Sequence, residues 1–241
     1  MPGKGPELGN PPPNDDSASA VALLGGVFDP PHQGHIDIGL SALQLEAVGE
    51  VIWIPCARIP HHKSSPVAPA EARLQMVERI CAEIDGFTVD DVEYHRQGPS
   101  YTVDTVRSLS QRFGDRPLLW IIGADNADKI AQWRSAEELW QMAIPVVAPR
   151  PGVQAGTTES TALNREDFPF IDEERWQQFL RWKLPPASGE ISSSEIRARL
   201  AQSEEPRSVI AEHPGIPEIL RDFLFRAAGI TLLLISSPGS T

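Results

Sequence analysis

Two histidines three residues apart, His32 and His35, lie in a glycine-rich stretch that reads Gly-Gly-Val-Phe-Asp-Pro-Pro-His-Gln-Gly-His. The stretch follows a short apolar run and opens an amphipathic segment, which predicts the turn from a strand into a helix. The first amides of a helix have no partner within the helix, and its macrodipole favours an anion there. Gly25, Gly26 and Gly34 permit a sharp bend and a close approach of the backbone to a ligand. These residues predict a phosphate-binding turn that carries two imidazoles.

Two further cationic side chains stand where they could reach the same anion. In the stretch Ile-Ser-Ser-Ser-Glu-Ile-Arg, which ends at Arg197, Ser192 followed by Glu195 is typical of a capping box that begins a helix. Arg197, on the opening turns, can present its planar guanidinium to an anion at that helix start. Lys63 lies in a polar loop after the apolar run 51–54 and can supply a mobile point charge.

A second group of residues suits a sugar and a planar ring. Ser100 predicts the N-cap of a helix over Tyr101–Phe113. Asp125 follows the strand predicted over 118–122 and can accept hydrogen bonds from ribose hydroxyls. Trp133 offers a flat face to a heteroaromatic ring, although a half-buried core tryptophan is the ordinary interpretation of such a residue.

The hydrophobic pattern predicts a scaffold that brings these loops together. Short apolar runs alternate with amphipathic stretches, which favours an α/β, Rossmann-like, doubly wound and mostly parallel sheet with helices on both faces. Ligands of such folds bind at the carboxyl ends of the strands, where the first motif lies. Strands are predicted over 21–24, 51–54, 87–92, 118–122 and 144–147, and helices over 36–47, 70–84, 101–113 and 136–141. In the remainder, a short strand is predicted over 168–171 and helices over 173–182 and 217–228.

The composition describes one soluble globular domain, since 41% of the 241 residues are hydrophobic and 22% are charged. The net charge of −12 argues against binding to nucleic acid or to an anionic membrane, because either needs a basic field. No apolar run is long enough to span a bilayer and no basic leader precedes a cleavage site, so a cytoplasmic protein is expected. Only Cys56 and Cys81 occur, without zinc-site spacing, which predicts neither a disulfide framework nor a structural metal.

The expected organisation has three parts. Residues 1–20 are rich in Pro, Gly, Asn, Asp and Ser and are predicted to be a flexible tail, because they can bury little apolar surface. Residues 21–228 form a single predicted domain, and residues 229–241 are an extension beyond it. Residues 153–190 carry little pattern, as is typical of regions that tolerate insertions.

The first motif, Gly-x-Phe-Asp-Pro-x-His-x-Gly-His, closely resembles the signature of the nucleotidylyltransferase superfamily, whose members transfer an adenylyl or cytidylyl group from a nucleoside triphosphate to a phosphate. The stretch ending at Arg197 resembles the Ile-Ser-Ser-x-x-Ile-Arg of adenylyltransferases, which closes over the triphosphate. The resemblance implies catalytic roles for His32, His35, Lys63 and Arg197. It implies that ATP is bound by Gly25, Gly26, Val27, Phe28, Gly34, Ser192 and Ser193. At Val27 the family often has Thr or Ser, so this chain would rely on backbone amides there.

Other stretches resemble the bacterial nicotinate-nucleotide adenylyltransferases, and the resemblance spans residues 21–228. Ser-Tyr-Thr-Val-Asp-Thr matches a helix start that receives the pyridine carboxylate in that family, and Gly-Ala-Asp followed by a tryptophan matches residues that line the pyridine site. Pro-Arg-Pro-Gly matches the family's Arg-x-Gly turn. The loop Pro60-His61-His62-Lys63 keeps three of the four residues of the family's Pro-Pro-His-Lys. The resemblance implies that nicotinate mononucleotide is bound by Ser100, Tyr101, Thr102, Asp125, Trp133 and Arg150.

The resemblance implies that ATP and nicotinate mononucleotide give deamido-NAD and pyrophosphate in NAD biosynthesis. The substrate phosphate is already a nucleophile, so positioning and neutralisation of charge suffice for catalysis. His32 is assigned to the α-phosphate, and His35, Lys63 and Arg197 to the β- and γ-phosphates. Mg²⁺ is expected to arrive with ATP, because the sequence shows no carboxylate cage for it. The expected partners are the two substrates, with the protein a monomer or a homodimer.

Three alternatives stay open. A nicotinamide-mononucleotide adenylyltransferase would use the same phosphate machinery without a carboxylate receptor, which the Ser-Tyr-Thr run disfavours. A phosphopantetheine adenylyltransferase shares the first motif but would not be expected to carry both Asp125 and Trp133. A non-catalytic nucleotide-binding sensor would tend to lose a histidine or the arginine, and none of the four cationic candidates is missing.

Overall fold

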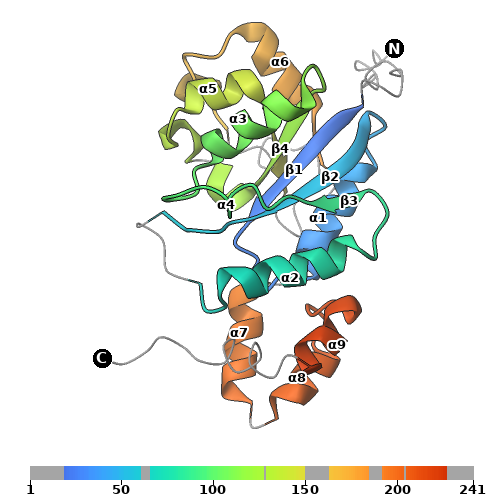
Figure 1. Ribbon diagram of the computed structural model, residues 1–241. Helices are drawn as coiled ribbons and strands as arrows, with labels where there is room; N and C mark the ends of the chain where they lie inside the picture. Colours follow the sequence, from blue (N-terminus) through green and yellow to red (C-terminus); the bar gives the residue numbers. More distant parts are fainter. Residues whose placement is uncertain are drawn as a thin grey trace, which may run out of the picture.

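The computed structural model describes residues 19–60, 66–127, 129–149, 163–184, 192–203 and 205–226. Within them, five parallel strands form one sheet in the order β3-β2-β1-β4-β5 (Figure 1). The strands are β1 (Ala20–Gly26), β2 (Val48–Pro55), β3 (Phe87–Val89), β4 (Leu118–Gly123) and β5 (Ile144–Ala148). Leu24 of β1 pairs with Trp53 of β2 and with Ile121 of β4. The first motif therefore leaves the sheet from its central strand.

The chain builds the sheet outward from β1 in two directions. It passes through α1 (Gln33–Leu43) to β2 and through α2 (Ala70–Cys81) to β3. It then returns through α3 (Thr102–Phe113) to β4 and continues through α5 (Ala136–Met142) to β5. Because crossovers between parallel strands are right-handed, the two directions place their helices on opposite faces. Figure 1 shows α1 and α2 on one side and α3 and α5 on the other. The predicted doubly wound fold is confirmed. The direction in which strands are added to the sheet reverses between β1 and β4, and ligands bind at this position in such folds.

Burial on both faces explains why the strands read as continuous apolar runs rather than as alternating ones. Val21, Leu23, Trp53, Leu119 and Ile122 are each at most 3% exposed. The helices bury an apolar stripe against this layer, so the sheet is the core of the domain.

The region after β5 contradicts one prediction. The strand predicted over 168–171 is wrong, because a turn occupies this stretch, directly after a 3-10 helix (Arg165–Asp167). Phe168 and Ile171 are buried, with the Phe168 ring 5.1 Å from that of Trp140. Arg165 donates to the carbonyls of Phe168 and Ile171, so its side chain satisfies backbone groups that a strand would have paired. The apolar residues here fill an aromatic cluster beside the sheet instead of adding to it.

Other elements differ from their predicted bounds at the ends. α1 begins at Gln33 because its first turn is polar, whereas the prediction began at the first apolar residue. β3 ends at Val89 because the Asp90 carboxylate accepts a hydrogen bond from the Val92 amide at 2.9 Å and closes a turn. α6 (Glu173–Arg181) agrees with prediction to within one residue. Ala20, predicted to lie in the flexible tail, is the first residue of β1, and the rest of the two predicted terminal segments lies outside the described residues apart from residue 19.

Three helices follow at one end of the sheet: α7 (Ser193–Gln202), α8 (Pro206–Glu212) and α9 (Glu218–Arg226). α7 and α9 both pack against α8, and α9 also packs against α2. Leu200, Ile210 and Leu220 are fully buried within this group. In the part of the chain that the structure describes, each helix is too short or too polar to cross a membrane.

Candidate active site

The loop after β1 is fixed by the packing of one aromatic side chain. Phe28 has a φ of +51° and is 2% exposed. Its ring centroid lies 5.1 Å from that of Trp53 on β2 and 5.0 Å from that of His35 on α1. A Cβ at residue 26 would lie 2.8 Å from the Phe28 ring, so Gly26 is required for this packing. The loop therefore follows one path from the sheet into α1.

His32 and His35 lie together at the start of α1, with ring centroids 3.7 Å apart. The His32 amide donates to His35 Nδ1 at 3.2 Å, which places the proton of a neutral His35 on Nε2. Burial lowers the pKa of His32 to about 4, and burial followed by the neighbouring His32 holds the pKa of His35 well below its usual range. His32 Nδ1 is buried and has no hydrogen-bond partner among the described residues. Both imidazoles are therefore neutral at pH 7 and ready to donate a hydrogen bond to an anion.

The low pKa of His32 predicts a pH dependence of stability. Between the ordinary pKa of 6.5 and the folded value of about 4, the unfolded chain binds the proton and the folded protein does not. Stability therefore falls as the pH falls through this window. We expect His32 to account for a loss of about 2 kcal/mol in the free energy of unfolding between pH 7.5 and pH 5. Urea denaturation of the wild type and of His32→Gln at both pH values measures this loss, and an equal loss in the two proteins would contradict the assignment.

The second motif contacts the first. Ser192 is the N-cap of α7 and accepts a hydrogen bond from the N3 amide at 3.1 Å, as predicted. Ser193 Oγ donates to the Pro30 carbonyl at 2.8 Å, across 163 positions of sequence. Arg197 Nη1 lies 3.5 Å from the Asp29 carboxylate and also donates to the Asp29 carbonyl. The guanidinium predicted to bind phosphate is thus held against the loop that leads to the two histidines.

One amide of the predicted phosphate-binding turn is used by the chain itself. The Gln33 amide, the first of α1, donates to the Gly215 carbonyl at 3.0 Å. The Gly215 amide in turn donates to Nδ1 of the buried His213 at 3.0 Å. The turn before α9 therefore covers this amide. An anion at the start of α1 would depend on the following amides and on the imidazoles.

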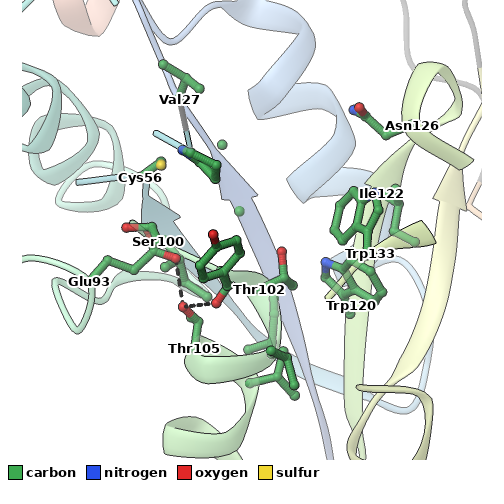
Figure 2. Close-up of a pocket in the computed structure, with 18 of the residues that line it drawn as sticks. Val27, Cys56, Glu93, Ser100, Thr102, Thr105, Trp120, Ile122, Asn126 and Trp133 are labelled. Atoms are coloured by element: carbon green, nitrogen blue, oxygen red, sulfur yellow. Dashed lines mark hydrogen bonds between the residues drawn. The ribbon is translucent and has the colours of Figure 1, made fainter. Parts of the chain in front are cut away.

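A cavity of about 360 Å³ opens at the carboxyl ends of β1, β2 and β4 (Figure 2). Three segments contribute most of the residues that concern the site: Gly25, Gly26 and Val27 from the end of β1, Ser100, Tyr101 and Thr102 from the start of α3, and Asn126, Trp133 and Arg134 from the segment after β4. Seven residues predicted from sequence to bind a nucleotide therefore line one cavity. Its volume is within the range of small-molecule sites.

One wall of this cavity is aromatic. Trp133 is half-buried, and its ring centroid lies 4.9 Å from that of Trp120 on β4. Figure 2 shows the two indoles next to each other on the same wall. The Arg134 guanidinium carbon lies 4.6 Å from the centroid of the Tyr101 ring. A planar ring can stack on this wall, with a cation at its edge.

The start of α3 differs from the prediction. Tyr101 is the N-cap, and the predicted N-cap Ser100 lies one residue before it. The Ser100 amide donates to the Arg58 carbonyl at 2.8 Å, and Ser100 Oγ accepts from the Arg58 amide at 3.4 Å. Ser100 thus joins α3 to the loop after β2, which is a contact between loops that local sequence does not predict. Thr102 and Val103 are the first two residues of α3, and both line the cavity. Their amides are therefore the ones at this helix start that belong to cavity-lining residues.

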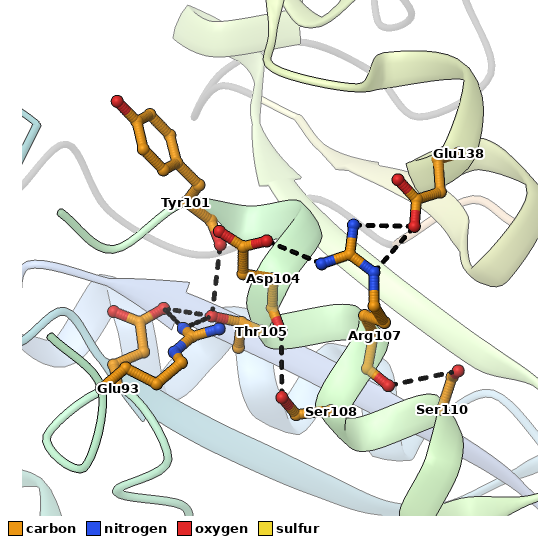
Figure 3. A network of polar contacts seen from close by, with 9 residues as sticks. Glu93, Tyr101, Asp104, Thr105, Arg107, Ser108, Ser110 and Glu138 are labelled. Carbon is orange, nitrogen blue, oxygen red and sulfur yellow. Dashed lines mark hydrogen bonds and ion pairs between the residues drawn. The ribbon is translucent and has the colours of Figure 1, made fainter. Parts of the chain in front are cut away.

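A polar network joins the start of α3 to the turn after β3 (Figure 3). Glu93 lines the cavity, is 8% exposed and accepts a hydrogen bond from Thr105 Oγ1 at 2.7 Å. Arg96 lies 3.8 Å from the Glu93 carboxylate and donates to Thr105 Oγ1. Burial, and after it the Glu93 charge, raises the pKa of the Cys56 thiol to about 11. The cysteine in this cavity is therefore protonated at pH 7 and is not a nucleophile.

The other predicted residues fall into three groups. Phe28, His32, Gly34, His35, Ser193 and Arg197 belong to the loop after β1, to α1 and to α7, and none of them is among the described residues that line the cavity. Lys63 and Arg150 lie outside the described residues. Asp125 lies in α4 (Ala124–Ala127), at the carboxyl end of β4, and its side chain is not described. The site thus has two parts, which meet where β1 runs into its loop.

Arg73 of α2 was not predicted and holds the site loops together. It is 1% exposed, and its guanidinium donates to the carbonyls of Val27, Ala68 and Ala57 at 2.6, 3.3 and 3.5 Å. It therefore ties the loop after β1 to the loop after β2. The signal in the sequence was a charged residue within the apolar stripe of an amphipathic helix. Glu93 and Arg134 carry no comparable signal, because they lie in turns.

Comparisons of sequence and of structure relate this chain to the same group of proteins. The sequence model of the family described as cytidylyltransferase-like matches residues 23–199. A probable nicotinate-nucleotide adenylyltransferase of Exiguobacterium sibiricum is 32% identical over 195 residues, which cover 80% of this chain and 92% of that protein. A protein of the same description from Aeromonas salmonicida is 34% identical, with 79% and 90% covered.

Among solved structures, the nicotinic acid mononucleotide adenylyltransferase of Plasmodium falciparum, complexed with NaAD, superposes with a TM-score of 0.63. The alignment covers 89% of this chain and 98% of that one at 18% identity, so it shows a shared fold. The family match and the two bacterial relatives show more than the fold. The chain belongs to the nicotinate-nucleotide adenylyltransferase family of cytidylyltransferase-like enzymes.

Proposed function

We propose that this protein transfers the adenylyl group of ATP to nicotinate mononucleotide and releases deamido-NAD and pyrophosphate, a step of NAD biosynthesis. The main support for this proposal is that two chemically different sites adjoin at the carboxyl ends of the strands. One holds two neutral imidazoles, with Arg197 bound to the loop that leads into them, and the other is a cavity with an aromatic wall. The names of the bacterial relatives support the same pair of substrates.

The triphosphate is assigned to the start of α1. His32 donates to the α-phosphate, while His35, Arg197 and Lys63 bind the β- and γ-phosphates. Phe28, Gly34, Ser192 and Ser193 shape this part of the site together with the end of β1. A buried donor that is not paired with water gains more from an arriving anion than an exposed donor does. The phosphates would also raise the low pKa values of the imidazoles.

The reaction needs no nucleophile from the protein. An oxygen of the acceptor phosphate attacks the α-phosphorus of ATP, and the bond from that phosphorus to the oxygen bridging to the β-phosphate breaks. Pyrophosphate leaves with the electron pair of the broken bond, so negative charge moves onto its oxygen. Catalysis then consists of holding the two phosphates in line and stabilising the charge that moves onto the leaving group. The two histidines and Arg197 supply donors for that charge.

A divalent metal ion, in our proposal Mg²⁺, accompanies the nucleotide and neutralises phosphate charge. Within the described ranges, no three His, Cys, Asp or Glu side chains are grouped so that they could hold a metal ion. The buried carboxylate nearest in sequence to the histidines, Asp29, already accepts a backbone amide on each oxygen. These residues fit an ion that is held by the phosphates of ATP rather than by a site of its own.

Nicotinate mononucleotide is assigned to the cavity. Its ring stacks on Trp133, its ribose reaches Asp125, and its carboxylate lies near the start of α3 and the amide of Thr102. Arg150 is proposed to complete the same pocket. Arg134 is the one cation among the described residues that line the cavity, and it lies over the Tyr101 ring at this helix start. A positive charge in that place favours an acid over the corresponding amide.

The substitution Arg134→Gln is expected to reduce the preference for the acid. Loss of one charge-assisted hydrogen bond should lower kcat/KM for nicotinate mononucleotide about tenfold, with little effect on nicotinamide mononucleotide. Pyrophosphate release with each acceptor measures both values. Arg107→Gln is the matched control, since Arg107 lies on α3, is not among the described residues that line the cavity, and pairs with Asp104 and Glu138, each at 2.7 Å. An equal loss for both acceptors would remove the role given to Arg134.

Turnover of nicotinamide mononucleotide by the wild type at the rate of the acid would remove the carboxylate-binding role given to the start of α3 and would favour the alternative that needs no carboxylate receptor. A monomer or homodimer in the cytoplasm stays our prediction for the assembly and its location.

A further inference from the structure

Asp29 is a buried carboxylate whose two oxygens are both engaged. It is 4% exposed and lies in the loop between β1 and α1. Oδ2 accepts the Val67 amide at 2.8 Å, and Oδ1 accepts the Ala68 amide at 2.9 Å. These amides belong to the turn that precedes α2, 38 and 39 positions away. One side chain therefore fixes the distance between the loop after β1 and this turn.

Arg197 reaches the same residue from α7. Its Nη1 lies 3.5 Å from Asp29 Oδ2 and donates to the Asp29 carbonyl, while Nη2 donates to Ser194 Oγ at 3.2 Å. A guanidinium has five N–H donors, and these contacts account for at most three of them. The Arg197 side chain is 26% exposed, so the remaining donors can reach a ligand.

These contacts fix the orientation of the Arg197 guanidinium but do not bury it in an ion pair. Because the Asp29 oxygens already accept two amides, the carboxylate is held in place before Arg197 approaches. A long side chain that would otherwise lose much rotamer freedom on binding a phosphate is thereby ordered in advance. The Asp29 charge also offsets the cost of holding a guanidinium partly out of water.

We propose that Asp29 is a positioning residue for the nucleoside triphosphate: it orients Arg197 and the turn at Val67 and Ala68 without touching the substrate itself. The inference rests on the proposed function in that Arg197 binds the β- and γ-phosphates of ATP. Asp29 then controls the binding of the donor and leaves the acceptor cavity unaffected, since it is not among the described residues that line that cavity.

Asp90 provides a matched control. It is 7% exposed. It is the first residue after β3, whereas Asp29 is the third residue after β1. Its Oδ1 accepts the Val92 amide at 2.9 Å, and its other oxygen is paired with Arg112. Asp90 thus has the same combination of backbone amide and arginine partner, but away from the loop that carries the histidines.

The test compares Asp29→Asn with Asp90→Asn in the full chain. Asparagine keeps the shape and one acceptor but loses the charge. We expect Asp29→Asn to raise the KM and the Kd for ATP about 10- to 100-fold, while the KM for nicotinate mononucleotide changes less than about twofold. Asp90→Asn should lower Tm by about as much as Asp29→Asn does, and should leave the KM for ATP unchanged. Direct titration with ATP gives the Kd without any turnover.

A second comparison isolates the partner. In an Arg197→Gln background, Asp29→Asn should change the Kd for ATP by less than about twofold, because Arg197, through which Asp29 acts on ATP, is gone. Additive losses in the double variant, equal increases in KM for both substrates, or an unchanged Kd for ATP in Asp29→Asn would each overturn the proposal. Failure of the wild type to make deamido-NAD would instead refute the proposed function, and the ATP titrations would still decide the role of Asp29.

Discussion

Replacing His32 with alanine is expected to lower kcat/KM for adenylyl transfer by about 10²- to 10³-fold, the effect typical of removing one preorganised donor to a charge that develops in the transition state. The imidazole is buried, neutral at pH 7 and packed against that of His35, with the ring centroids 3.7 Å apart, so its N–H is fixed in direction before ATP binds. Water can replace a mobile surface donor, but it replaces a buried and oriented donor poorly. Steady-state rates of pyrophosphate release measure the loss.

His95→Ala is the control for the loss of a histidine. The His95 side chain is 72% exposed and pairs with Asp91 at 2.9 Å, so its removal should leave both kcat and KM within about twofold of wild type. If His32→Ala retained the wild-type kcat/KM, the assignment of the α-phosphate to the start of α1 would be wrong.

The second large effect is expected from Arg73→Met, on stability and activity together. The substitution removes a side chain that is 1% exposed, and with it the donor to the carbonyls of Val27, Ala57 and Ala68. With each unsatisfied buried group costing about 1–3 kcal/mol and some relief by relaxation, the free energy of unfolding should fall by about 3 kcal/mol. The loop after β1 then loses one of its anchors, so kcat/KM should fall about tenfold as preorganisation is lost.

Arg79→Met on the same helix tests whether the effect belongs to the buried position. The Arg79 side chain is 52% exposed and lies 3.8 Å from Glu83, and exposed pairs of this kind contribute at most about 1 kcal/mol. Urea denaturation and steady-state kinetics of the two variants give the comparison. Equal stability of Arg73→Met and wild type would show that the three carbonyls do not depend on the guanidinium.

Local pattern was sufficient to predict the sheet and the motif that leaves it. The run at Val21 to Leu24 is apolar because a central parallel strand is buried on both faces, and this property is visible within a few residues. The pairing of His32 with His35 was also predictable, since residues three apart meet at a helix start. The Ser192 N-cap follows from the same local chemistry.

Contacts between distant segments could not be predicted in this way. Asp29 accepts hydrogen bonds from amides 38 and 39 positions away, and the residues around Val67 do not indicate that these amides pair with a distant carboxylate. Ser100 has the composition of an N-cap, yet its hydrogen bonds go to Arg58 of another loop. Phe168 opens a short apolar run like that of a strand, but the space that it fills is an aromatic cluster beside the sheet. In each case, tertiary packing overrode a local preference.

The proposed reaction is tested most directly by product analysis after incubation of the wild-type protein with ATP, Mg²⁺ and nicotinate mononucleotide. We expect deamido-NAD and pyrophosphate in equal amounts, with much less product from nicotinamide mononucleotide or phosphopantetheine. ATP that binds but is not consumed with any of the three acceptors would refute adenylyl transfer and would favour a nucleotide sensor.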